Sequence, residues 1–268
     1  MVYHYWSKPC WHGSTVVVDG LMSAQVFELA NPEATADAAA LSVVEGLDEA
    51  LSGREWATLA ISGGSAPKIL FPRLAAAPIR WDRVHLFWVD ERSVPPDHAD
   101  SNYRLANELL VTPARIPKDH VHRIQAEADP REAAQRYEND IRGFFGLRGT
   151  ALPVFDVIHL GIGPDGHTAS LFPGEALIED RSGTVTALYV PKMKTWRITL
   201  LPGPLLAARR ALFFAVGQDK AEVVGHIFGS EYAPAKWPAQ LINRHGANVI
   251  WYMDQAAARN RPPNAGSD

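Results

Sequence analysis

Short apolar runs alternate with stretches of helical periodicity along most of the chain. Apolar and β-branched runs predict strands at residues 15–18, 57–61, 84–89, 154–160, 197–201, 211–216 and 247–252. Apolar residues at helical spacing predict helices at residues 32–51, 129–145 and 218–228, and a last helical turn at 254–258. This alternation predicts an α/β fold, a mostly parallel, Rossmann-like sheet with helices on both faces.

Local signals add detail to this pattern. Asn31 is the predicted N-cap of the first long helix, because Pro32 suits the first helical position. Pro72 lies inside the next helical stretch and predicts a kink or a restart there. No linker-like stretch divides the chain, so we expect a single domain at residues 15–258, with tails at 1–14 and 259–268.

Composition narrows the class of protein. With 268 residues, 47% of them hydrophobic and 21% charged, the chain is typical of a soluble globular protein and not of a fibrous or disordered one. A net charge of -4 gives no reason to expect a nucleic acid or an anionic membrane as partner. Cys10 is the single cysteine, and neither a zinc-binding spacing, a signal peptide nor a membrane-spanning run is recognisable. We therefore expect a cytoplasmic protein without a metal.

Ligands of open α/β sheets bind beyond the carboxyl ends of the strands, so the loops at these positions are the candidate ligand-binding segments. The first such loop contains Gly63, Gly64 and Ser65, directly before a helix predicted to begin near Pro67. Glycines allow close backbone approach, and a helix start offers free N–H groups to an anion. A phosphate site and a plain glycine turn are both compatible with so short a motif.

The second loop begins with three charged residues at the end of the apolar run 84–89. Asp90 or Glu91 can orient a sugar hydroxyl or a water molecule, and Arg92 can bind a phosphate through its forked guanidinium. The alternative is an internal ion pair at the sheet edge.

The third loop, residues 161–168, contains the letters GxGxxG. We do not expect a dinucleotide site, because Pro173 would end any helix after about two turns, whereas a dinucleotide-binding loop opens a long helix. The loop instead is predicted to place Gly163, Asp165 and His167 beside a ligand. Histidine is the side chain best suited to accept a proton near neutral pH.

Two cations near the same edge complete the candidate set. Lys220 is predicted in the first turn of a helix, where a positive charge opposes the helix dipole unless an anion binds. Arg197 directly precedes the apolar letters ITLL. Taken singly, each is more simply explained as a surface base. Together with the glycine loops they predict a small phosphorylated metabolite as ligand.

Five motifs of the chain indicate a resemblance to a known family. ISGGSAP, VDERSVPPDHADSNY, GIGPDGHTASLFPG, RITL and GQDKAEVV occur in this order, and the chain resembles the 6-phosphogluconolactonase family from residue 15 to 258. The resemblance implies a fold like that of glucosamine-6-phosphate deaminase and ribose-5-phosphate isomerase. It also implies hydrolysis of 6-phospho-D-glucono-1,5-lactone in the oxidative pentose phosphate pathway, without metal or other cofactor. The segment 191–196 departs from the proline-rich segment usual in the family.

The resulting hypothesis assigns a role to each candidate. His167 is the general base that activates water, Asp165 holds its tautomer, and Asp90 contacts a sugar hydroxyl. Backbone N–H groups of the glycine turns stabilise the oxyanion. The phosphate is assigned to Ser65, Arg92, Arg197 and Lys220. We expect a monomer or a weak homo-oligomer.

Two alternatives remain at this stage. A glucosamine-6-phosphate deaminase resembles AFNEP where this chain has Ser170 to Gly174, and no acid follows here until Glu175. A non-catalytic sugar-phosphate-binding protein is the other alternative, although the chain shows no DNA-binding module.

Overall fold

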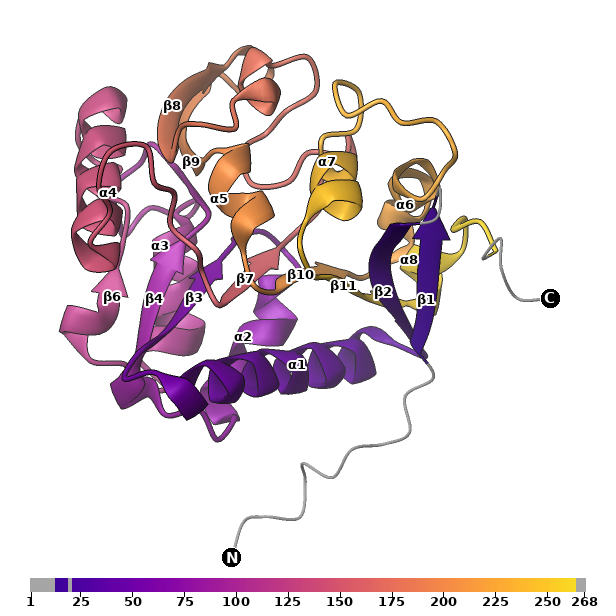
Figure 1. Ribbon diagram of the computed structural model, residues 1–268, viewed down its shortest axis with the longest axis horizontal. Helices are drawn as coiled ribbons and strands as arrows, with labels where there is room; N and C mark the ends of the chain where they lie inside the picture. The colour runs from indigo at the N-terminus through magenta and orange to yellow at the C-terminus, as the bar shows by residue number, and fades with distance from the viewer. Residues whose placement is uncertain (1–12, 19–20, 264–268) are drawn as a thin grey trace, which may run out of the picture.

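The computed structural model describes residues 13–18 and 21–263. An eight-stranded sheet forms its centre (Figure 1), and every pair of neighbouring strands is parallel except β1 with β2. The strand order is β1 (Gly13–Val18), β2 (Leu21–Leu29), β11 (Val249–Asp254), β10 (Ala211–Ala215), β7 (Val157–Leu160), β3 (Ala57–Ile61), β4 (Val84–Trp88) and β6 (Val121–His122). The predicted α/β class with a mostly parallel sheet is confirmed.

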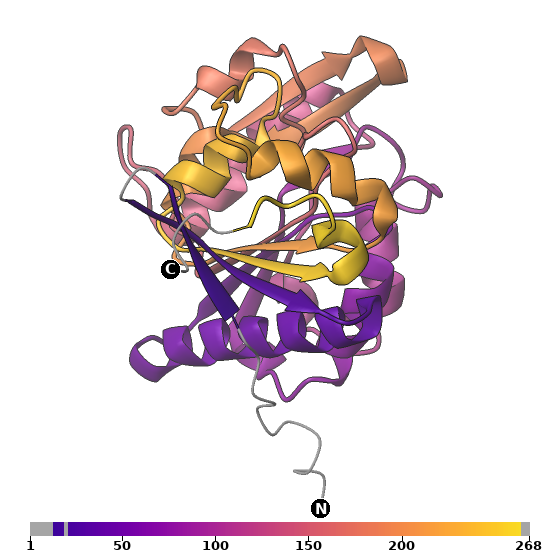
Figure 2. The same cartoon turned by 90° about the vertical axis from the view of Figure 1, so that its right-hand side faces the viewer.

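Helices cover both faces of this sheet. Figure 2 shows the indigo α1 on one side and the orange to yellow helices α5, α6 and α7 on the other. The helices are α1 (Pro32–Gly53), α2 (Pro67–Ala76), α3 (Asn102–Ala106), α4 (Pro130–Phe145), α5 (Pro202–Ala207), α6 (Ala221–Ile227), α7 (Ala239–His245) and α8 (Gln255–Ala258). No helix of the described residues has the length and apolar character that a membrane crossing requires.

A second, antiparallel sheet lies beyond the carboxyl ends of the central strands. It contains β5 (Asp90–Arg92), β9 (Thr195–Leu200) and β8 (Val185–Val190), in this order. Val89 joins the two sheets, because its N–H donates to the Ile61 carbonyl (2.9 Å) and its own carbonyl accepts from the Leu200 N–H (2.8 Å). The residues that follow β4 are thereby held next to the loop that follows β3.

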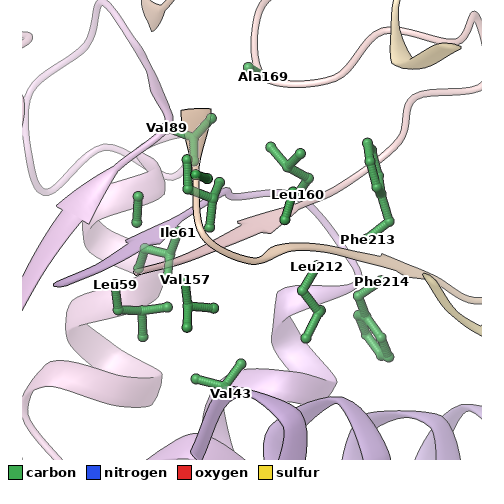
Figure 3. Packing of buried hydrophobic residues seen from close by; sticks show 14 of the residues in the cluster. Val43, Leu59, Ile61, Val89, Val157, Leu160, Ala169, Leu212, Phe213 and Phe214 are labelled. Atoms are coloured by element: carbon green, nitrogen blue, oxygen red, sulfur yellow. The ribbon is translucent and has the colours of Figure 1, made fainter. Parts of the chain in front are cut away.

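The core explains why the central strands are apolar along their whole length. Figure 3 shows Leu59, Val157 and Leu212 on the side of Val43 from α1, whereas Phe213 points the other way. All five side chains are fully buried. Because helices cover both faces, both alternating sets of side chains must be apolar.

Several helix predictions are confirmed. The Asn31 side chain accepts a hydrogen bond from the Ala34 N–H (2.8 Å), and α1 begins at Pro32. Asp129 caps α4 in the same way. α2 continues through Pro72, so the predicted restart does not occur, while the predicted kink stays a prediction. Pro72 lies on the exposed side of α2, while Phe71 on the buried side anchors the helix in the core.

Other boundaries also differ from the prediction. The strand predicted at 154–160 begins only at Val157, because the buried carboxylate of Asp156 accepts hydrogen bonds from the N–H and hydroxyl of Thr58. The segment predicted at 197–201 lies in the second sheet, which the pattern did not predict. The helix predicted at 218–228 is a 3-10 turn, Gln218–Lys220, followed by α6. Residues 1–12 of the expected tail, Cys10 included, lie outside the described residues.

Candidate active site

Four loops that follow β3, β4, β7 and β10 surround one pocket of about 180 Å³. Its lining therefore combines all four segments that the sequence marked as candidates. The lining residues are Ser62, Gly63, Gly64, Ser65, Ala66, Asp90, Arg92, Asn102, Gly161, Ile162, Gly163, His167, Ala169, Phe214 and Lys220. Two candidates, Asp165 and Arg197, lie outside this lining but contact or neighbour residues within it.

His167 and Asp165 form a hydrogen-bonded pair at the edge of the pocket. His167 Nδ1 lies 2.5 Å from Asp165 Oδ1, and about a quarter of each side chain is exposed. The hydrogen bond from His167 lowers the pKa of Asp165 to about 2, so this carboxylate is ionised at neutral pH. An ionised carboxylate only accepts hydrogen bonds, so Nδ1 carries the proton and Nε2 keeps a lone pair.

Gly163 makes this pair possible. A Cβ at this position would lie 2.1 Å from Nδ1 of His167 and 2.9 Å from Oδ1 of Asp165. The Gly163 N–H donates to the His167 carbonyl (2.9 Å), which closes the turn. No helix follows the turn, because residues 161–175 form turns and one isolated bridge between Thr168 and Leu171. Gly163 thus leaves room for two side chains, as expected for a loop that is not a dinucleotide site.

The loop after β3 has the properties of an anion-binding loop. The backbone N–H groups of Gly63, Gly64 and Ser65 donate to no acceptor among the described residues. Gly64 has a φ of +107°, which favours glycine. A Cβ on Gly63 would lie 1.7 Å from Oδ1 of Asn102, so this residue must also be glycine for Asn102 to reach its place.

The three charged residues after β4 have three different environments. Glu91 is buried and accepts hydrogen bonds from the N–H groups of Asn102 (2.7 Å) and Tyr103 (2.7 Å), so it fixes the start of α3. Burial raises the pKa of this carboxyl. Asp90 is also buried, and its Oδ2 accepts from the Ser170 hydroxyl (2.7 Å). Glu91 is therefore a structural clamp, whereas Asp90 lines the pocket.

Arg92 and Arg197 bring two positive charges together. They lie directly opposite each other in the β5–β9 ladder, which puts their side chains on the same face. Neither forms an ion pair with a carboxylate of the described residues, and the Nε of each is buried without a hydrogen-bond partner there. Arg92 Nη1 donates to the Asp100 carbonyl (2.5 Å). Burial lowers the pKa of Arg197.

Lys220 supplies a third cation from the far side of the pocket. Its Nζ lies 3.0 Å from Oδ2 of the exposed Asp219, and 13% of its side chain is accessible. The 3-10 turn that carries it follows Gly217, whose φ is +97° and whose N–H donates to the Asp254 carboxylate. Lys220 is the N-cap of α6 and not a residue of its first turn as predicted, but its positive charge still lies at the amino end of the helix.

Two residues of the site were not predicted from the sequence. Asn102 lines the pocket, is buried, and has an Oδ1 without a hydrogen-bond partner in the described residues. Its place in the motif SNY was the available signal. Lys192 lies 3.7 Å from Oδ2 of Asp165, and no sequence signal pointed to it.

Unpartnered buried polar atoms gather at this pocket. Such atoms are uncommon in folded proteins and call for an explanation, of which a ligand is one. Three of the lining residues carry one, namely Ser62, Arg92 and Asn102, and Arg197 adds a fourth. Among the described residues, no group of three or more His, Cys, Asp or Glu side chains is arranged to hold a metal ion.

A known protein family matches most of this chain. Residues 30–251 match the family model described as glucosamine-6-phosphate isomerases/6-phosphogluconolactonase. The chain belongs to this family. The resemblance that the motifs indicated is thus confirmed.

The relatives named here match three quarters or more of this chain. The 6-phosphogluconolactonase of Synechocystis sp. is 38% identical over 90% of this chain and 100% of its own length. The 6-phosphogluconolactonase of Homo sapiens is 39% identical over 75% of this chain and 79% of its own length. The solved structure of 6-phosphogluconolactonase from Trypanosoma brucei has a TM-score of 0.79 and 30% identity, and covers 88% of this chain and 97% of that one. The fold is therefore that of solved 6-phosphogluconolactonases.

Proposed function

We propose that this protein hydrolyses 6-phospho-D-glucono-1,5-lactone to 6-phospho-D-gluconate, the second step of the oxidative pentose phosphate pathway. It acts as a carboxylic ester hydrolase, with His167 as general base and with the phosphate bound among cations. The observation that carries the proposal is the pocket itself. It is lined both by the histidine whose Nε2 is free to accept a proton and by Arg92, Lys220 and the glycine loop.

The phosphate end is formed by charges that lack a compensating partner. Arg92 and Arg197 are adjacent, and each retains a buried Nε with no acceptor in the described part of the chain. A phosphate dianion supplies acceptors to both guanidinium groups and to the unpaired N–H groups of residues 63–65. Ser65 and Lys220 line the same pocket and complete the site.

The reacting end is the pair of His167 and Asp165. Nε2 of His167 removes a proton from water as the water oxygen attacks C1 of the lactone. The tetrahedral intermediate then collapses, the bond between C1 and the ring oxygen breaks, and the same proton passes from Nε2 to that oxygen. Such general-base assistance contributes about 10²- to 10⁴-fold. Asp165 keeps the proton of the imidazole on Nδ1 and stabilises the imidazolium that forms.

Two further groups orient the sugar ring. Asp90 is held by Ser170 through one carboxylate oxygen and is the proposed contact for a sugar hydroxyl. Backbone N–H groups of the glycine turns are the proposed donors to the oxyanion. The Gly163 N–H is not one of these donors, because it already donates to the His167 carbonyl.

The test is a direct assay of lactone hydrolysis. The lactone is generated in place by oxidation of glucose 6-phosphate, and the appearance of 6-phosphogluconate is followed with and without the protein. We expect hydrolysis well above the spontaneous rate. A rate equal to the spontaneous one would reject the proposal.

The same preparation separates the two alternatives. A deaminase would release ammonia from glucosamine 6-phosphate, but Glu175, the nearest acid after the turn, does not line the pocket. We therefore expect no ammonia. Tight binding of 6-phosphogluconate without any lactone turnover would instead favour the non-catalytic binding protein. The cytoplasmic location and the monomeric or weakly associating state remain predictions.

A further inference from the structure

The turn between β8 and β9 contacts both ends of the proposed site. It consists of the 3-10 turn Pro191–Met193 and Lys194, whose φ of +51° is unusual for a residue other than glycine. Met193 contacts Arg197, and the adjacent Lys192 lies 3.7 Å from Asp165. A single turn thus reaches the proposed phosphate ligand and the proposed catalytic pair.

The contact between Met193 and Arg197 is chemically mismatched. Arg197 is 8% exposed, and its one side-chain hydrogen bond to the described residues is from Nη2 to Sδ of Met193, 3.1 Å away. A thioether sulfur is a weak acceptor, whereas a buried guanidinium forms its strongest hydrogen bonds with anions. Any anion that reaches Nη2 is therefore a better partner than the sulfur.

The Met193 side chain is also placed so that an anion can displace its sulfur from Arg197. Met193 is 42% exposed as a whole residue, so it contributes less to the core than a buried methionine would. Methionine is unbranched and has three rotatable bonds, which allows the sulfur to move without a change in the backbone. Moving Sδ away from Arg197 therefore breaks one weak hydrogen bond and leaves the sheet intact.

We propose that Met193 is a specificity-determining residue, whose sulfur occupies Nη2 of Arg197 in the free enzyme and is exchanged for an oxygen of the substrate's phosphate. This inference rests on the proposed function, because it takes Arg197 as a phosphate ligand. A lactone without a phosphate has no anion to replace the sulfur, so its binding gains nothing from Arg197. The sulfur thereby sets, by competing with the phosphate, how strongly Arg197 favours phosphorylated over unphosphorylated lactones, and its removal should increase this preference.

A series of acceptors at position 193 tests the exchange. Met193→Leu removes the sulfur at similar volume, Met193→Gln supplies a stronger neutral acceptor, and Met193→Glu supplies an anion tethered beside Arg197. For 6-phosphogluconolactone we expect KM to rise in the order Leu, Met, Gln, Glu, with Met193→Leu about twofold below the wild type and Met193→Glu about tenfold or more above it. For glucono-1,5-lactone we expect no such order.

The control is a charge on the same hairpin but on the opposite face of the sheet from Arg197, because Tyr189 pairs with Trp196 in the β8–β9 ladder. Tyr189 is 45% exposed in β8, and Tyr189→Glu adds the same charge as Met193→Glu. We expect Tyr189→Glu to change KM by less than about twofold, since screened surface charges act weakly at a distance. Both positions are exposed, so all variants are expected to fold, and thermal unfolding checks this.

The outcomes separate the inference from the function on which it rests. If Met193→Glu and Tyr189→Glu share the same KM, the exchange is refuted. Should Arg197→Ala raise KM while the position-193 series stays flat, the inference fails and Arg197 keeps its role. If folded Arg197→Ala has the wild-type KM, the phosphate assignment of Arg197 fails, and the inference fails with it.

Discussion

The imidazole of His167 occupies the space that a side chain at position 163 would fill, so position 163 must be glycine. A Cβ on Gly163 would lie 2.1 Å from Nδ1 and Cε1 of the imidazole, well inside van der Waals contact. The side chain of His167 would then have to leave Asp165. The glycine at position 163 therefore makes room for the proposed catalytic pair, His167 and Asp165, and does not serve to bind a pyrophosphate.

Gly163→Ala tests this relationship. Gly163 does not have a positive φ, so alanine fits the backbone while displacing the imidazole. We expect kcat to fall by about 10- to 100-fold, the loss typical of a catalytic group moved by about 1 Å. Gly143→Ala in α4 is the control, because a Cβ there meets no atom within 4 Å and should leave kcat unchanged. An active Gly163→Ala would contradict the steric argument.

Asp165→Asn removes the ionised partner of His167 with little change in shape. An amide can present its NH₂ group to Nδ1, which puts the imidazole proton on Nε2 and leaves no base toward the water. We expect kcat to fall by about 10²-fold or more, with KM nearly unchanged. Because the pKa of Asp165 is about 2, the wild type keeps this charge throughout the range from pH 5 to 8. Equal kcat values for the two proteins would remove Asp165 from the mechanism.

Arg92→Ala and Lys220→Ala test the phosphate site. Each removes one positive charge from the pocket lining, so KM for the phosphorylated lactone should rise about tenfold or more while kcat changes less. The KM for glucono-1,5-lactone should not change. Lys236→Ala, which removes an exposed lysine paired with Glu231, is the control. Similar turnover of the two lactones by the wild type would argue against a phosphate site.

His159 gives a pH dependence of stability. This imidazole is fully buried beneath the pocket, and burial lowers its pKa from 6.5 to about 4. The unfolded chain therefore binds the proton more readily, so the contribution to stability is complete above pH 6.5 and is lost as the pH falls toward 4. Between pH 7 and 5 we expect the free energy of unfolding to drop by on the order of 2 kcal/mol from this residue.

Urea unfolding at the two pH values measures this drop. His159→Asn is the informative variant, because the amide oxygen can replace Nδ1 as acceptor for the Ser62 N–H (3.4 Å) and does not titrate. The variant should lose less stability than the wild type over this range. An identical loss in both proteins would mean that other groups, such as His85, account for the whole effect.

The sequence predicted the elements whose signals are local. Buried parallel strands are apolar throughout, so β3 and β10 were recognisable, and Asn31 followed by Pro32 defines a helix start by capping alone. The loops after these strands were recognisable as a candidate site, because the carboxyl ends of parallel strands meet at one edge of the sheet. The roles proposed for His167 and Asp165 came from their residue types in this loop and from the family resemblance.

The features that were missed depend on contacts between distant segments. The second sheet forms by backbone pairing of β5 with β9, which are more than a hundred residues apart in the chain. A strand was predicted at 197–201, but no local pattern indicated its partner. Glu91 looked like a candidate for chemistry, but the N–H groups of α3 turn it into a clamp. Lys192 reaches Asp165 through the shape of a hairpin turn, which its sequence did not reveal.

The most direct test of the account is the turnover of 6-phosphogluconolactone by His167→Ala. His167 is partly exposed at the edge of the pocket, so the variant should fold like the wild type, as circular dichroism and thermal unfolding would check. We predict that kcat falls by about 10²- to 10⁴-fold while the variant still binds 6-phosphogluconate. A folded His167→Ala protein with a kcat near that of the wild type would contradict the account.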